Sequence, residues 1–117
     1  MTLGEMIAVL KRKPAGAFVY FDFVHFRPSG DVHSYRGYYE QFAIGYTNEG
    51  ENVTAGGLLA KLEAACGAEF YGYKGGSYTM YSDTPVWVAN HNESGGTAVV
   101  DIRDEDWRIL IVTASID

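Results

Sequence analysis

The stretch AFVYFDF at residues 17–23 decides the fold class of this chain. It is β-branched and aromatic on both faces of an extended segment, so both faces would be apolar. It therefore predicts a central strand that is covered on both sides. Pro14 precedes this stretch and is expected to end whatever helix comes before it.

Two short amphipathic helices are predicted. Thr2 and Glu5 form a capping box, and the apolar residues that follow repeat with helical spacing, which predicts a helix over residues 3–12. Thr54 is suited to cap a second helix with one apolar stripe, and Gly67 is suited to end it.

The other apolar segments have the pattern of strands. A loop is expected over residues 24–34 and a polar turn over residues 104–106, where turn-forming and charged residues gather. Strands are predicted over residues 38–46, 68–73, 77–81, 86–89, 97–103 and 108–113.

This order of elements predicts one ligand-binding domain over residues 1–117. We expect the α+β class, with a mainly antiparallel, twisted sheet and both helices on one of its faces. The opposite face would be aromatic, and the edges of the sheet would need cover. A homo-oligomer would provide that cover.

Composition limits the partners of the chain. Fifteen acidic residues against nine basic ones give a net charge of −6, which argues against binding to duplex nucleic acid. No stretch approaches the roughly 18 apolar residues that span a bilayer, and the chain starts without a basic leader, so we expect an intracellular protein with no membrane partner.

Cysteine and histidine usage gives no sign of a metal or cofactor. Cys66 is the one cysteine, which excludes an internal disulfide, and it is expected to be a small buried residue at the end of a helix. His25, His33 and His91 are too widely spaced for a metal motif. No cofactor is therefore expected.

One local chemistry occurs twice: aromatic residues beside glycine and a cation, in YRGYY at residues 35–39 and in YGYKGGSY at residues 71–78. Glycine lets a ligand approach the backbone, rings offer stacking faces, and cations bind phosphate. Arg36 would then hold a phosphate while a tyrosine such as Tyr38 stacks on a base, and Lys74 with its glycines would cradle an anion.

Each motif also has a purely structural interpretation. The tyrosines at residues 35–39 could alternate between core and interface while Arg36 pairs with Glu40 on the surface. The segment around Lys74 could be a tight hairpin turn that exposes the lysine.

Later segments add three candidates. Asn90 lies in an amide-rich loop, where it could recognise a base or ribose edge, although such loops are also ordinary turns and the nearby Trp87 could be core. Asp101 and Arg103 share one face of a predicted strand, so Asp101 could position Arg103 for a phosphate or simply form a surface salt bridge.

Five segments, at residues 19–23, 34–39, 43–46, 71–76 and 87–90, together resemble small phage proteins of the first Thoeris anti-defence family. The resemblance covers most of the chain. It implies a protein that acts in the host cytoplasm and sequesters, without cleaving them, the cyclic ADP-ribose isomers made by bacterial TIR-domain enzymes. Some members also hold cyclic oligonucleotides at a separate site in a higher oligomer, so the resemblance implies a dimer or a hexamer.

The family's ligand pocket lies between subunits and uses arginines, an aromatic ring and an asparagine. Carried over to this chain, it points to Arg27 or Arg36, Tyr78, Asn90 and Arg103. Tyr81 is the alternative to Tyr78, and Arg108 is the alternative to Arg103.

We therefore expect a sponge for a cyclic nucleotide and not an enzyme. The expected ligand-binding residues are Arg27, Arg36, Tyr38, Lys74, Tyr78, Asn90, Asp101 and Arg103. One rival is an enzyme acting on a nucleotide or sugar phosphate, with Glu40 or Asp22 as base, although no known catalytic motif is present. The other is an inhibitor of a host defence protein that acts through its acidic surface and aromatic face.

Overall fold

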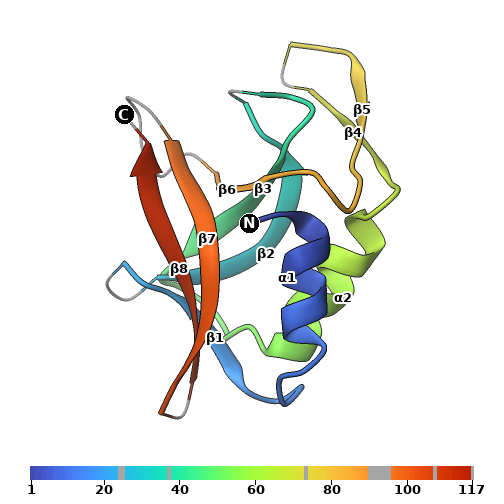
Figure 1. The fold of residues 1–117 in the computed structure, drawn as a ribbon. Coiled ribbons are helices and arrows are strands. Elements are labelled where there is room, and N and C mark those ends of the chain that lie inside the picture. The colour runs from blue at the N-terminus through green and yellow to red at the C-terminus, as the bar shows by residue number, and fades with distance from the viewer. Residues whose placement is uncertain (24–25, 37, 73, 90–95, 107, 117) are drawn as a thin grey trace.

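The computed structural model describes residues 1–23, 26–36, 38–72, 74–89, 96–106 and 108–116 (Figure 1). Both helices and strands are present, as the α+β prediction requires. In chain order the elements are α1 (Leu3–Leu10), β1 (Phe18–Phe21), β2 (Arg27–Ser34), β3 (Phe42–Thr47), α2 (Ala55–Ala65), β4 (Glu69–Tyr71), β5 (Ser77–Thr79), β6 (Val86–Val88), β7 (Gly96–Glu105) and β8 (Arg108–Ile116).

Six strands form one sheet in the order β1-β8-β7-β6-β3-β2, while β4 and β5 pair separately. Antiparallel pairs are the majority, as predicted, but the sheet is mixed because two of its strand pairs are parallel. β1 pairs with β8 in parallel, and so does β3 with β6, whereas the pairs β2–β3, β6–β7 and β7–β8 are antiparallel. A parallel pair requires a long crossover, and α2 lies within the one that joins β3 to β6.

β1 lies at one end of the hydrogen-bonded order, so the prediction of a central strand is wrong. Its free edge is covered by the segment before α2: the Val19 N–H donates to the Val53 carbonyl at 2.9 Å, and Phe18 bridges to Thr54. Val19 is fully buried but Phe18 is 38% exposed, because the core covers only one face of this strand. A continuous apolar run does not distinguish these two arrangements.

The loop expected over residues 24–34 is wrong from residue 27 onward, because residues 27–34 form β2 against β3. The register shifts between Pro28 and Val32, and Gly30 has a φ of 89°. A bulge therefore accommodates the turn-forming residues that would otherwise end the strand.

Two other connections also bear on the prediction. β3 begins at Phe42 and not at residue 38, because the Gln41 N–H returns to the Tyr38 carbonyl at 2.8 Å in a turn. The polar turn is shorter than predicted: Asp104 and Glu105 pair with β8 as the end of β7, and Asp106, with a φ of 49°, follows them at the tip of the hairpin.

Both helices begin where the sequence predicts. The Thr2 N–H donates to Glu5 Oε1 at 2.8 Å, and the Glu5 N–H donates to Thr2 Oγ1 at 3.2 Å, which completes the capping box. Thr54 Oγ1 accepts from the Gly57 N–H at 3.1 Å, and Gly67 follows α2 with a φ of 85°. Figure 1 shows α1 and α2 on the same side of the sheet.

The core lies between the helices and the face of the sheet that we call the inner face; the opposite one is the outer face. Residues of both helices share one buried cluster with strand residues, including Leu3, Met6, Leu58, Leu62, Val19, Ile44, Val88, Val99 and Ile111. Cys66 is exposed at the end of α2, so the expectation of a buried cysteine is wrong. In the part of the chain that the structure describes, no helix has the length and apolar character to cross a membrane.

Candidate functional site

Trp87 lies on the outer face of the sheet. Val86 and Val88 are each 1% exposed and belong to the core, and side chains alternate along a strand, so Trp87 points the other way. In the strand register it faces Ala43 of β3 and Ala98 of β7. These small neighbours leave space around the indole, which is only partly buried.

Trp87, Tyr35 and Tyr38 form what we call the aromatic cluster. The Tyr35 and Trp87 rings are stacked, with centroids 4.8 Å apart and an angle of 1° between their planes. Tyr38 is tilted against both, at 6.4 Å from Tyr35 and 6.2 Å from Trp87. Trp87 Nε1 donates to Gln41 Oε1 at 2.5 Å. Two rings are therefore fixed, while the third, Tyr38, is 55% exposed.

A recess of about 430 Å³ lies on the outer face beside this cluster. Its position follows from the strand register: His33 faces Ala43, and Ala43 faces Trp87, so His33 and Trp87 are about 10 Å apart at two strand spacings. We call it the polar recess, and the residues that line it are Ser29, Asp31, His33, Gly45, Tyr46, Thr47 and Ala89.

The polar recess is neutral to acidic. Burial lowers the pKa of His33 below its ordinary value of 6.5, and the Asp31 carboxylate opposes this shift. The imidazole is therefore mainly neutral at pH 7, with one nitrogen as donor and the other as acceptor. Ser29 Oγ accepts from the Asp31 N–H at 3.2 Å. The site is thus suited to hydrogen bonding with uncharged groups.

The two arginine candidates on and after β2 differ. Arg27 is 8% exposed, and its guanidinium donates to the carbonyls of Gly50 at 2.6 Å and Glu51 at 3.4 Å. It therefore holds the turn after β3 against β2. Arg36 is exposed and follows Tyr35 directly in the chain.

Lys74 is exposed in the β4–β5 turn. The Gly75 N–H donates to the Gly72 carbonyl and the Gly72 N–H to the Gly76 carbonyl, both at 3.0 Å. Gly75 and Gly76 have φ angles of 99° and 87°, which suit glycine. The hairpin-turn interpretation is therefore confirmed, and these two N–H groups serve the turn.

Tyr78 is partly buried, and its ring lies 5.8 Å from that of Tyr39. Tyr81, the alternative stacking residue, is 59% exposed. Asn90 lies outside the described residues.

Asp101 and Arg103 form a salt bridge on β7, with 3.1 Å between Oδ2 and Nε. Their side chains are about half and two-thirds exposed, so the bridge contributes little to stability. The Ile102 N–H, and then Arg103, hold the pKa of Asp101 below its ordinary value. The surface pair is thus confirmed, and contact with a phosphate stays a prediction.

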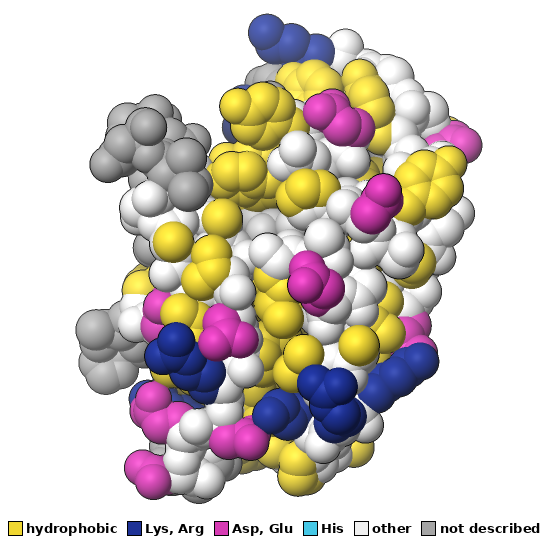
Figure 2. Space-filling model, in the orientation of Figure 1, with side chains coloured by type: hydrophobic (Ala, Val, Ile, Leu, Met, Phe, Trp, Pro, Cys, Tyr) yellow, Lys and Arg dark blue, Asp and Glu magenta, His cyan; other side chains and the backbone are white. Residues whose placement is uncertain are grey.

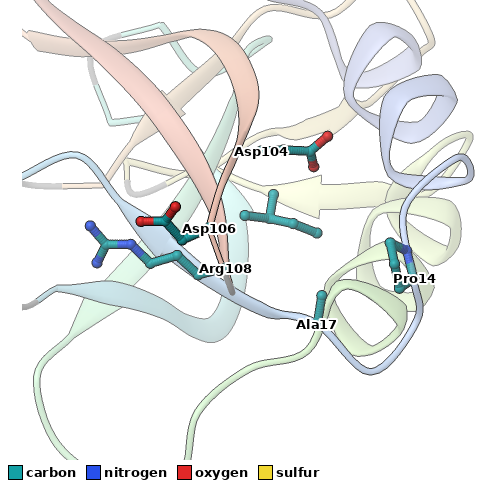
Figure 3. Close-up of a pocket in the computed structure, with 6 residues that line it drawn as sticks. Pro14, Ala17, Asp104, Asp106 and Arg108 are labelled. Carbon is teal, nitrogen blue, oxygen red and sulfur yellow. The ribbon is translucent and has the colours of Figure 1, made fainter.

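Arg108 lies at a second cavity of about 310 Å³, near the tip of the β7–β8 hairpin. Figure 3 shows its guanidinium pointing away from Pro14 and Ala17. It pairs with Glu105 at 2.6 Å and lies 5.4 Å from the Tyr20 ring. The cavity is lined by Pro14, Ala17, Asp104, Asp106, Arg108 and Ile109, and Asp104 pairs with Lys13 at 3.0 Å.

The predicted residues do not converge within one chain. Arg27 and Ser34 are at opposite ends of β2, roughly 20 Å apart. Arg103 is about 16 Å along β7 from Ala98, the neighbour of Trp87. Acidic and basic side chains are intermixed where Figure 2 shows the lower part of the molecule, and neither sign dominates there. Of the predicted residues, Tyr38 lies in the aromatic cluster, and Arg36 is next to Tyr35 of that cluster in the chain.

The polar recess is what the sequence analysis missed. Ser29, Asp31 and His33 occupy alternate positions, which is a strand signal, but Pro28 before them and Gly30 among them favour a loop. The alternation of the polar residues Ser29, Asp31 and His33 is the signal that could have identified this part of the outer face.

The chain matches no protein-family model, no curated protein and no solved structure. Within the described ranges, no group of three or more His, Cys, Asp and Glu residues is arranged to hold a metal ion. The aromatic cluster and the polar recess together form the candidate site.

Proposed function

We propose that this chain is a phage anti-defence protein that binds cyclic ADP-ribose isomers and sequesters them without cleaving them. The resemblance at residues 34–39 and 87–90 supplies the class of ligand. The observation that carries the proposal is that the exposed Tyr38, against the stacked pair of Tyr35 and Trp87, shares the outer face with a recess of ligand size. A base would stack on the rings, with Arg36 at its phosphate.

Binding without turnover is supported by the state of one candidate base. The Asp22 carboxylate accepts from the Thr113 N–H at 2.9 Å and from the Thr113 hydroxyl at 2.5 Å. These contacts tie β1 to β8 and give the carboxylate a structural role. Glu40, the other candidate, is exposed in the turn before β3.

A homo-oligomer, a dimer or a hexamer, is part of the proposal. Tyr38 and Val100, which follows Ala98 and Val99 on β7, are 55% and 45% exposed, and a second subunit would bury both side chains. Arg103 is too far along β7 to reach the aromatic cluster of its own chain. A second subunit would bring another arginine to that cluster, and a separate site for cyclic oligonucleotides would belong to the higher oligomer. The place of action would be the host cytoplasm.

Calorimetry with cyclic ADP-ribose isomers tests the proposal. A sponge requires tight binding, and a dissociation constant of about 10 nM corresponds to roughly −11 kcal/mol. The ligand recovered after denaturation of the protein must be the same compound that was added, as judged by chromatography. A chemically altered ligand would show that the protein is an enzyme. Capture of a host protein without any small molecule would favour the rival function, an inhibitor of a host defence protein.

A further inference from the structure

We propose that the polar recess binds the hydroxyl groups of a ribose, beside the aromatic cluster that holds the base. This inference rests on the proposed function and names the part of the ligand that each half of the site takes.

The shape of the recess is suited to a sugar ring. Ala89 lines it with a methyl group instead of a long side chain, and Ser29 packs over Gly45 to form one wall, with its Oγ 2.5 Å from where a Cβ atom would lie. The register shift between Pro28 and Val32 lies in the strand that carries Ser29 and Asp31. Bulges of this kind redirect side chains and are common beside binding sites.

The chemistry of the lining favours hydroxyls over phosphate. An exposed carboxylate accepts hydrogen bonds from sugar hydroxyls, as the acidic residue of dinucleotide-binding folds does with ribose. Asp31 is placed for this role, and the neutral imidazole of His33 adds one donor and one acceptor. The oxygen of Ser29 accepts from the backbone, so its O–H hydrogen serves as a donor.

Phosphate is disfavoured at the same place. The described residues that line the recess include an aspartate and neither lysine nor arginine. A phosphate there would meet the negative charge of Asp31 without a compensating cation. The phosphate of the ligand therefore lies toward Arg36, and the recess takes the uncharged ribose.

The test compares ligands that differ by one hydroxyl. Calorimetry is performed with cyclic ADP-ribose and with its 2′-deoxy and 3′-deoxy analogues, on the wild type, on Asp31→Asn and on Asp83→Asn. Asp83 is an exposed carboxylate outside the recess and serves as the matched control. We expect loss of one hydroxyl to weaken binding about tenfold in the wild type and in Asp83→Asn, and clearly less in Asp31→Asn, because the amide no longer offers a charged acceptor.

Equal affinities of the wild type for all three ligands would overturn the inference, as would unchanged discrimination in Asp31→Asn. A second arm separates it from the proposed function. Amide chemical shifts are recorded with methyl β-D-ribofuranoside, and we expect changes at Asp31, His33 and Gly45. Shifts there without any binding of cyclic ADP-ribose would overturn the proposed function and support the ribose site. Neither shifts nor binding would overturn both.

Discussion

Tyr35 and Trp87 stack in parallel, with ring centroids 4.8 Å apart and 1° between their planes. Gly96 lies against this pair: a Cβ atom there would be 2.7 Å from Tyr35 Oη and 2.8 Å from Trp87 Cζ3. The stack therefore depends on the absence of a side chain at Gly96, and it supplies a rigid platform on the outer face.

Gly96→Ala is expected to destabilise the protein by about 1–3 kcal/mol, because two fixed rings would have to move for one methyl group. Chemical denaturation measures the change, and near-UV circular dichroism reports the displaced rings. Gly16→Ala is the matched control, since a Cβ there would meet nothing within 4 Å. An unchanged near-UV spectrum in Gly96→Ala would contradict the close packing.

Tyr38→Ala is expected to weaken binding of cyclic ADP-ribose by about 1–3 kcal/mol, the usual value of one ring stacked on one base. Stability should change little, because the side chain is 55% exposed. Calorimetry measures the affinity. Tyr71→Ala removes another tyrosine, 80% exposed on β4, and should leave it unchanged. Equal losses of affinity in the two variants would mean that Tyr38 is not the ring that stacks on the base.

Arg27→Met and Arg36→Met are expected to have opposite effects. Loss of Arg27 leaves the carbonyls of Gly50 and Glu51 without these bonds, and should cost about 1–3 kcal/mol of stability with no change in affinity for cyclic ADP-ribose. Arg36→Met should lower that affinity, because the guanidinium is the proposed contact of the phosphate. Urea denaturation and calorimetry of both variants check this. The proposal for Arg36 fails if its variant binds like the wild type.

Local signals in the sequence predicted local structure. The capping box of Thr2 and Glu5, the cap at Thr54 and the glycine at residue 67 depend on neighbours within a few positions, so both helices were predictable. The hairpin turn around Lys74 was likewise one of two interpretations that its glycines allowed.

Long-range arrangement was not available from the same signals. Nothing in residues 17–23 shows that β1 pairs with β8 in parallel and lies at an end of the sheet. The bulge that keeps Gly30 within β2 depends on pairing with β3, so the propensity for a loop was overridden by tertiary contact. For the same reason the polar recess appeared only in the structure.

His33 is expected to make stability depend on pH. Its folded-state pKa lies below 6.5, so as pH falls the unfolded chain takes up the proton first. Above pH 6.5, His33 therefore does not affect stability. As the pH falls below 6.5 the stability decreases, and it levels off once the pH is below the folded-state pKa of His33. Urea denaturation between about pH 5 and pH 8 should show a smaller decrease in His33→Gln than in the wild type. Identical pH profiles would contradict the burial of this imidazole.

Gly45 and Ser29 provide a test of the recess itself. A Cβ atom on Gly45 would lie 2.5 Å from Ser29 Oγ, whereas its next neighbours, both in Asp31, would be at 3.4 Å. Gly45→Ala should therefore cost about 1–3 kcal/mol, mainly through one hydroxyl. Ser29→Ala removes that hydroxyl together with its bond to the Asp31 N–H, at a cost of about 1 kcal/mol.

The double variant Gly45→Ala, Ser29→Ala should be more stable than the sum of the two single effects predicts, with a coupling of about 0.5–3 kcal/mol, since the clash needs both groups. A double-mutant cycle by urea denaturation measures it. Additive effects would mean that Ser29 does not pack on Gly45. The Ser29 hydroxyl would then not be held in the recess, where the proposal needs it as a hydrogen-bond donor to the ligand.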